Sequence, residues 1–412
     1  MDDLYDLDYS NYADLIPLIS DDVVVSTLRR IYNENFDPQN EIEENLFDHT
    51  WSILNEATDK GFGKIEYGHP DFEFLQEVKY NNAVFAAFKT HRQQNDLFVQ
   101  LTDDKGVPKS FAQFKKDSEP IIGRYNVDWL QTEYNTALIR ARTAVQFKQF
   151  EREAHIYPNL KWLPSMAAIP REGHKPFYNR VWAQSDPFWR SHRPGDEWGC
   201  KCGITSTDEP VTDGVISTQE MPEASPGLDN NPAEDGKLFS DTHPYVKDGY
   251  GSLKKRRKLA ELTADSAVIK AWAEEIIETR KPKGVTKEVG TLDKAVLKFL
   301  KKEKIHPANR QIVLSDSALN HMLRDVKKHP LAPVDIAKIK GYLQTAETYF
   351  DAGKKNILFI VDKENGKSLK IVVQPNYKCK INGEKVEVNY VTTSGYIETY
   401  NKVANGYKKI KV

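Results

Sequence analysis

Two cysteines separated by one residue, Cys200 and Cys202, are the residues of this sequence best suited to bind a metal. Thiolate and imidazole groups are preferred ligands of tetrahedral Zn²⁺, and His174 or His192 could join them. Structural zinc sites usually separate their cysteines by two to four residues, so this spacing is a departure. In a strand, however, both side chains would point to one face, which permits chelation. The alternative is that both thiols are small buried apolar groups among aromatic residues.

A second set of residues, near the C-terminus, has the chemistry needed to cleave RNA without a cofactor. His321 and Arg324 are three residues apart, on one face of a predicted helix. The imidazole could take the proton of a 2′-hydroxyl, whose oxygen then attacks phosphorus to form a cyclic phosphate. Arg324 could hold the phosphate through its planar guanidinium group. The candidate catalytic residues are His321, Arg324, Thr392, Thr393 and Tyr400.

The C-terminal block is also basic. From Ile305 to the end there are 18 Lys and Arg and 10 Asp and Glu, a charge of +8, so the rest of the chain carries −10 (−2 − 8). A basic block on an acidic chain indicates a separate module with an anionic partner. Alternatively, the basic block is only a solvated lysine-rich surface. Likewise, His321 could be a surface residue with no catalytic role. The candidate nucleic-acid-binding residues are Lys327, Lys328, Lys378 and Lys380.

The elements that must position these residues are expected in five regions, which make the protein multidomain and α+β. They are an acidic arm (1–20), a mainly helical domain ending in a small strand-and-turn region with the cysteines (21–204), a Pro/Gly/Asp-rich arm or linker (205–250), a helical connector (251–304) and a compact basic domain (305–412). We expect the last to pack two helices on an antiparallel sheet.

Apolar periodicity supports this division. Helices are expected after Ser20 and at Phe72–Lys89, Val127–Arg152, Leu259–Arg280 and Leu292–Lys302, and short strands around Leu160–Leu163 and Arg180–Ala183. In the basic block we expect a strand at Ile312–Leu314, helices at Asp316–Lys328 and Val334–Ala346, and four later strands at Ile357–Val361, Leu369–Val373, Glu384–Thr393 and Tyr407–Val412. Asn365-Gly366 and Asn382-Gly383 are typical hairpin turns between these strands.

Several classes of protein are disfavoured by the composition. No apolar run reaches the length of about 18 residues that a membrane span needs, so no membrane partner is expected. The acidic start, Met1-Asp2-Asp3, differs from the basic, then apolar, start of a secretory signal. Three cysteines are too few for a disulfide scaffold. We therefore expect a protein made and used in a bacterial cytoplasm or in a virion.

An ordered series of motifs over roughly residues 20–250 resembles the phage Mu protein F-like, or SPP-type, head-morphogenesis family. The central motifs are Glu133-Tyr134-Asn135-Thr136-Ala137, Pro158-Asn159-Leu160-Lys161-Trp162, Arg171-x-x-His174, Asp186-Pro187-Phe188-Trp189 and Trp198-Gly199-Cys200-Lys201-Cys202, with Ala86–Thr90 and Leu101–Gly106 before them and Asn231–Ala233 and Phe239–Tyr245 after them. The segment Lys175–Arg180 departs from the family's glycine-containing turn. The resemblance implies a minor capsid protein of a tailed phage or prophage, with portal and capsid proteins as partners and the phage head as its location.

The order of elements in residues 305–412, with Leu314-Ser315-Asp316 before the helix of His321, resembles the barnase–EndoU–colicin–RelE-like nuclease superfamily. Phage-type members are fused to Mu F-like head proteins. This resemblance implies an RNase-like effector that needs no metal, acts on RNA or DNA and has a cognate immunity protein as a partner. One alternative is a structural head protein whose basic domain binds nucleic acid without cleaving it. Another toxin chemistry, ADP-ribosyl transfer, is disfavoured because residues 305–412 contain no Glu-x-Glu.

Overall fold

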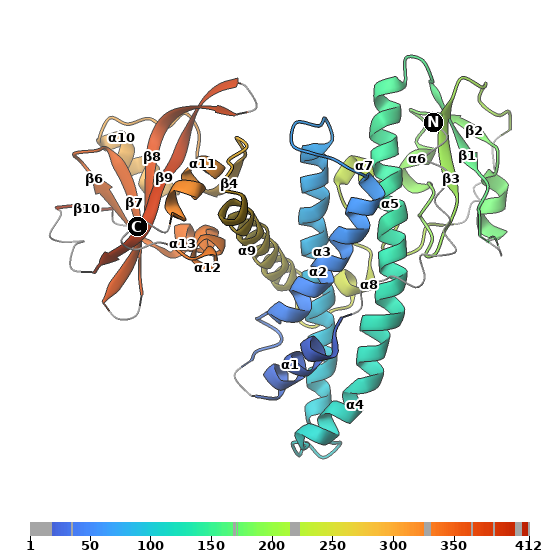
Figure 1. Ribbon diagram of the computed structural model, residues 1–412, viewed down its shortest axis with the longest axis horizontal. Coiled ribbons are helices and arrows are strands. Elements are labelled where there is room, and N and C mark those ends of the chain that lie inside the picture. The colour runs from blue at the N-terminus through green and yellow to red at the C-terminus, as the bar shows by residue number, and fades with distance from the viewer. Residues whose placement is uncertain are drawn as a thin grey trace. The chain divides into compact units, whose positions relative to one another are not determined.

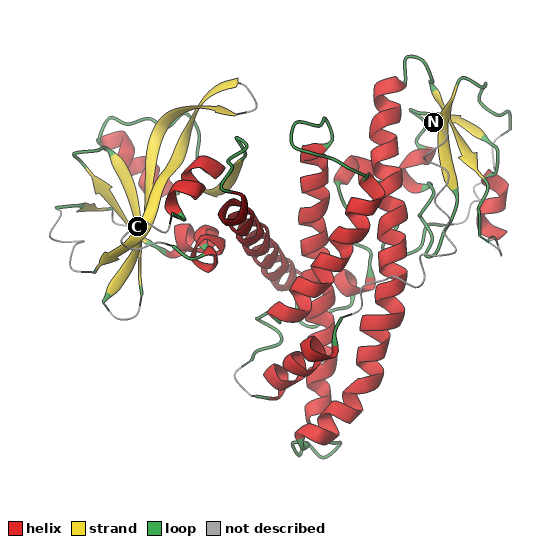
Figure 2. Cartoon of the chain, in the orientation of Figure 1, coloured by secondary structure: helices red, strands yellow, loops and turns green. Residues whose placement is uncertain are grey.

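The computed structural model of the chain describes residues 19–33, 36–167, 170, 172–214, 223–324, 331–363, 366–381, 384–399 and 406–410. The chain forms two compact units, Met1–Ala264 and Asp265–Val412, and helix α9 (Leu253–Thr279) contributes to both. The mixture of helix-rich and sheet-rich parts confirms the α+β, multidomain prediction (Figure 2). None of the helices in the described ranges is long and apolar enough to span a membrane.

The first unit is built around long helices (Figure 1). They are α1 (Asp21–Tyr32), α2 (Glu44–Phe62), α3 (Phe72–Phe98), α4 (Phe111–Gly123) and α5 (Trp129–Glu153), and one π-helical turn (Arg124–Asp128) joins α4 to α5. Gly61 allows α2 and α5 to approach closely, because a Cβ atom there would lie 2.6 Å from the carbonyl oxygen of Leu138. The expected helices of this region are present, and α2 and α4 are additions to them.

A three-stranded antiparallel sheet completes the first unit. Its order is β2 (Val181–Ala183), β1 (Asn159–Leu163) and β3 (Gly203–Thr207). The short elements of this unit are η3 (Val99–Leu101), η5 (Glu172–Phe177), α6 (Phe188–Ser191), α7 (Pro232–Asp235) and α8 (Pro244–Lys247). The sequence predicted β1 and β2. It missed β3, whose residues Gly203–Thr207 are mostly small and polar and give little apolar alternation.

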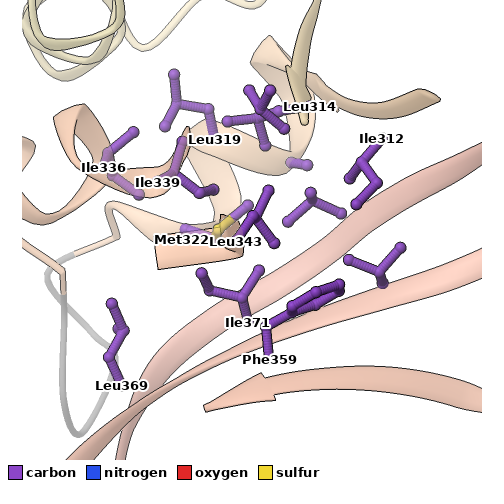
Figure 3. Packing of buried hydrophobic residues seen from close by; sticks show 14 of the residues in the cluster. Ile312, Leu314, Leu319, Met322, Ile336, Ile339, Leu343, Phe359, Leu369 and Ile371 are labelled. Carbon is purple, nitrogen blue, oxygen red and sulfur yellow. The ribbon is translucent and has the colours of Figure 1, made fainter. Parts of the chain in front are cut away.

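The second unit contains a seven-stranded sheet among its described residues, in the order β10-β6-β7-β8-β9-β5-β4. The strands are β4 (Thr286–Thr291), β5 (Gln311–Ser315), β6 (Glu347–Asp351), β7 (Asn356–Asp362), β8 (Lys367–Ile381), β9 (Glu384–Glu398) and β10 (Lys408–Lys409). The helices are α10 (Lys294–Lys302), α11 (Asp316–Met322), α12 (Pro333–Ala337) and α13 (Ile339–Thr345). Leu319, Met322, Ile339 and Leu343 of α11 and α13 pack on Phe359 and Ile371 of the sheet (Figure 3).

Three expectations for this unit were wrong in detail. The sheet is larger than four strands and not wholly antiparallel, because β5 pairs with β9 in parallel. The single helix expected at Val334–Ala346 is divided into α12 and α13. The helix expected to reach Lys328 ends at Met322, because Leu323, with φ −91° and ψ 12°, leaves helical geometry. The turn residues Asn365, Asn382 and Gly383 lie outside the described residues.

Candidate metal centre

The predicted metal ligands come from two separate elements of the first unit. His174 lies in η5, and Cys200 and Cys202 lie directly before β3. All three side chains are buried, with exposed fractions of 1%, 3% and 9%. The ligand atoms lie within 4.8 Å of one another, so this cluster could hold a metal ion. The structure thus brings together the three residues that the sequence predicted.

The distances within the cluster match those expected around zinc. Nδ1 of His174 lies 3.5 Å from Sγ of Cys200 and 3.6 Å from Sγ of Cys202. Zinc binds sulfur at about 2.3 Å and imidazole nitrogen at about 2.05 Å, so two such ligands at a tetrahedral angle lie about 3.6 Å apart. Nδ1 of His174 therefore lies at the distance from both sulfur atoms that a tetrahedral zinc site requires, and these residues would supply three of its four ligands.

Asp196 orients the histidine of this cluster. Its carboxylate Oδ1 lies 3.0 Å from Nε2 of His174, which leaves Nδ1 directed at the two sulfur atoms. Ligating histidines commonly use their second nitrogen in this way, and the partner fixes the ring and its tautomer. His192 also faces Asp196, with 3.8 Å between Nδ1 and Oδ2, and is not a member of the ligand cluster.

The electrostatics of the cluster follow from these contacts. Burial alone would lower the pKa of His174, but hydrogen bonds with Asp196 and Cys200 raise it to about 10. Burial would raise the pKa of Asp196, and the imidazole groups of His174 and His192 beside it lower that pKa to about 2. The hydrogen bond between the two cysteines raises the pKa of Cys200 and lowers that of Cys202. Cys202 is therefore the more readily ionised thiol of the pair.

An aromatic shell surrounds the cluster. Trp162, Phe177, Phe188 and Trp189 belong to the same buried core as the two cysteines, and Trp182 stacks on Phe188 with ring centroids 4.1 Å apart. Apolar surroundings exclude water, which stabilises bonds between a metal and its ligands. The two interpretations of the cysteines are thus compatible, because the thiols are part of an apolar core and are also arranged as ligands.

The candidate nuclease residues of the second unit have a different environment. His321 and Arg324 are exposed at the end of α11, whereas Thr392 and Thr393 are half-buried in β9. Helix α11 packs against β9, so the two elements that carry these residues are neighbours in the unit. The Thr392 hydroxyl donates to the carbonyl oxygen of Val372 at 3.4 Å.

The lysines proposed to bind nucleic acid are only partly covered by the described residues. Lys378 and Lys380 are exposed on the hairpin of β8 and β9, and the Lys378 side chain is 83% exposed and lies 3.4 Å from Glu387. Tyr400, Lys327 and Lys328 lie outside the described residues.

The sequence interpretation missed Asp196, which holds the histidine. Its only local signal is its position between the aromatic motif and the cysteines, on the same loop as Cys200. A loop carboxylate four residues before a ligand has no period or motif that would distinguish it from a solvated residue. Its role depends on the fold, which brings η5 to this loop.

Comparisons with known proteins agree with part of the sequence resemblance. The chain is 31% identical over 75 residues to the putative capsid assembly protein F of Escherichia phage Mu, a match that covers 18% of this chain and 17% of that protein. It is 25% identical over 132 residues to the Mu-like prophage FluMu F protein of Haemophilus influenzae, covering 30% of each chain. The chain thus matches less than a third of either relative. No family model and no solved structure matches the chain. These findings support the similarity to Mu F proteins and give no support to the nuclease resemblance.

Proposed function

We propose that this protein is a minor capsid protein that takes part in head assembly of a tailed phage or prophage. The observation that carries the proposal is the pair of matches to F proteins, one of which is named for capsid assembly. In this role the protein contacts portal and capsid proteins, is made in the bacterial host and ends in the virion. The aromatic core and long helices of the first unit suit a scaffold.

Deletion of the gene in the phage or prophage that carries it tests this role. We expect lysates without DNA-filled heads and, from the parent phage, purified heads that contain this chain together with portal protein. Complementation in trans should restore filled heads. Normal titre from the deletion, with no chain detected in parental heads, would contradict the proposal.

We propose further that His174, Cys200 and Cys202 hold a structural zinc ion. The match between the nitrogen–sulfur distances and tetrahedral geometry, with Asp196 behind the histidine, supports this assignment. When bound, the ion would link η5 to the segment before β3. The chain's own part is to supply two thiolates and a neutral imidazole in a dry pocket.

Elemental analysis of the purified chain tests the zinc proposal. We expect about one zinc per chain in the wild type and near-complete loss in Cys200→Ser, since a ligand is removed. Cys379→Ser is the matched control because Cys379 belongs to the second unit and is not a member of the cluster, so this variant should keep its zinc. Absence of stoichiometric zinc from the wild type would sink this idea.

For the second unit we propose an RNase-like effector activity that needs no metal. The exposed His321 at the end of α11, with Arg324 after it and β9 packed against the same helix, supports the assignment of His321 as general base. Lys378 and Lys380 add positive charge on the neighbouring hairpin. The alternative is a domain that binds nucleic acid without cutting it.

RNA degradation by the full chain in EDTA separates these two functions. We expect cleavage by the wild type and a loss of about 10²–10⁴-fold in His321→Ala, the usual contribution of an acid–base group. His306→Ala is the matched control, because this histidine lies outside α11. If wild type and variant are both inert yet bind DNA with a steep salt dependence, the binding function replaces the nuclease. An immunity protein would appear as an inhibitor encoded beside this gene.

A further inference from the structure

The segment 223–250, which we call the strap, packs tightly on the helices of the first unit. The sequence suggested an arm or linker here, but many of its side chains are buried in the structure. These include Leu228, Leu238, Phe239, His243, Tyr245 and Val246. Its two short helices, α7 and α8, begin with asparagine and histidine caps whose side chains accept from Ala233 and Tyr245. The strap is therefore a folded part of this unit.

Arg140 of α5 joins the strap to the segment that carries the metal ligands. The guanidinium group is 1% exposed and donates to the carbonyl oxygens of Leu228 at 3.0 Å and Leu238 at 2.6 Å. It also donates to the carbonyl oxygen of Gly195 at 2.8 Å, within the segment 193–202, which we call the ligand loop. A Cβ atom at Gly195 would lie 2.9 Å from Cγ of Arg140, so this close approach requires glycine.

The ligand loop also contacts the strap directly. The carbonyl oxygen of Asp196 accepts from the backbone N–H of Ser225 at 2.8 Å. Arg193 donates to the carbonyl oxygen of Leu228 at 3.1 Å. Trp198, two residues before Cys200, stacks on Phe239 with 5.8 Å between ring centroids. Thus the loop that orients His174 and supplies Cys200 also holds one side of the strap.

The strap in turn covers an aromatic surface of α3. Phe239 stacks on Phe85 with ring centroids 4.2 Å apart, and His243 meets the same ring edge-on at 4.9 Å. The Tyr245 hydroxyl donates to Glu133 of α5 at 2.7 Å. Glu133 is the buried partner of Lys89, so separation of the strap would expose both an apolar surface and a buried ion pair to water.

We propose that the metal centre fastens the strap to the helices, so that metal occupancy controls whether this aromatic surface is covered. The inference rests on the proposed zinc site. With His174 and both cysteines bound to one ion, the ligand loop is fixed at two positions and presents Trp198 and the carbonyl oxygens of Gly195 and Asp196 to the strap. Without the ion, Cys200 and Cys202 no longer fix the ligand loop. The strap then keeps its contacts with the helices but loses firm support from the ligand loop.

Hydrogen–deuterium exchange on the full chain tests the inference, with zinc-loaded protein compared with protein treated with a chelator. We expect amides of residues 225–246 to exchange about tenfold faster or more without metal, because local opening becomes easier, while the second unit is unchanged. Returning zinc should restore protection. If chelation removes the zinc but strap protection stays the same, the fastening role is overturned and the zinc site stands. If the purified wild type holds no zinc, both proposals fail.

A variant separates fastening from metal binding. Trp198→Ala leaves all three ligands in place but removes the stacking on Phe239. We expect it to keep about one zinc per chain and to show faster exchange in the strap than the wild type. Trp51→Ala is a matched control, because this tryptophan lies on α2 and its indole N–H bonds to Lys79 of α3. Equal strap protection in Trp198→Ala and the wild type would overturn the inference.

Discussion

The metal cluster of the first unit and the candidate nuclease residues of the second differ in burial and in the contacts that the fold gives them. His174, Cys200 and Cys202 are buried, lie at ligand distances and have a carboxylate behind the histidine. His321 and Arg324 are exposed at the end of a seven-residue helix. A buried polar site must be complete, because unsatisfied groups there are costly. At a surface site, water solvates the polar groups until a substrate binds, so they need no partner within the protein.

The same contrast holds for charged groups in general. The first unit buries Lys89 with Glu133, and Arg140 with backbone carbonyl oxygens, whereas the lysines of the β8–β9 hairpin remain in water. Substitutions in the first unit should therefore act mainly on stability. Substitutions on the exposed groups of the second unit should act mainly on binding or cleavage.

The largest expected effect comes from Lys89→Met. This change leaves Glu133 buried without its cation, and breaking a buried pair typically costs about 3–5 kcal/mol of unfolding free energy. Urea unfolding followed by tryptophan fluorescence reports mainly on the first unit, because Trp272 alone of the seven tryptophans lies beyond residue 264. Lys79→Met breaks a more exposed pair with Asp59 and should cost no more than about 1 kcal/mol. Equal losses of unfolding free energy in both variants would contradict the expectation that the buried ion pair contributes more to stability than the exposed pair.

A somewhat smaller effect is expected from pH. Burial, with a contribution from Lys89, lowers the pKa of His243 to about 3, whereas in the unfolded chain it is near 6.5. The unfolded state therefore binds the proton first as pH falls, and stability is lost from about pH 6.5 down to about pH 3. Between about pH 7 and 4 the loss is about 3 kcal/mol, at 1.36 kcal/mol per pKa unit.

His243→Asn provides the control for this pH dependence. Asparagine can still accept from the N–H of Tyr245 at the start of α8, but it does not titrate. We expect the variant's unfolding free energy to fall less steeply over this pH range than that of the wild type. Parallel pH profiles would show that His243 is not the group responsible.

The smallest effect on stability is expected from Lys378→Ala combined with Lys380→Ala. Both side chains are exposed, so unfolding free energy should change by no more than about 0.5 kcal/mol. Binding of a short RNA should weaken, and the slope of log affinity against log salt should fall by about one for each phosphate that the variant no longer neutralises. Lys115→Ala with Lys116→Ala, on exposed positions of α4, should leave the slope unchanged. An unchanged slope in the hairpin variant would exclude these lysines from the nucleic-acid surface.

The sequence by itself determined the residue types of the metal cluster and most of the long elements. Val127–Arg152 has no glycine or proline and an apolar face, and it became α5 almost to the residue. Short, mostly apolar runs likewise predicted β7 and the first part of β8. Such patterns are local, because they record which side of an element is buried.

Tertiary structure decided which elements and side chains the buried face of each helix or strand contacts. The polar strand β4 exists because it pairs with β5, and β5 joins the sheet only through its parallel pairing with β9, more than 70 residues later. His174 meets Cys200 across 26 residues of chain, and Asp196 and Arg140 acquire their partners in the same way. These interactions leave no period in the sequence, since they depend on elements brought together only when the core forms. The cysteine pair was therefore visible from the sequence, whereas the arrangement that makes it a fitting metal site was not.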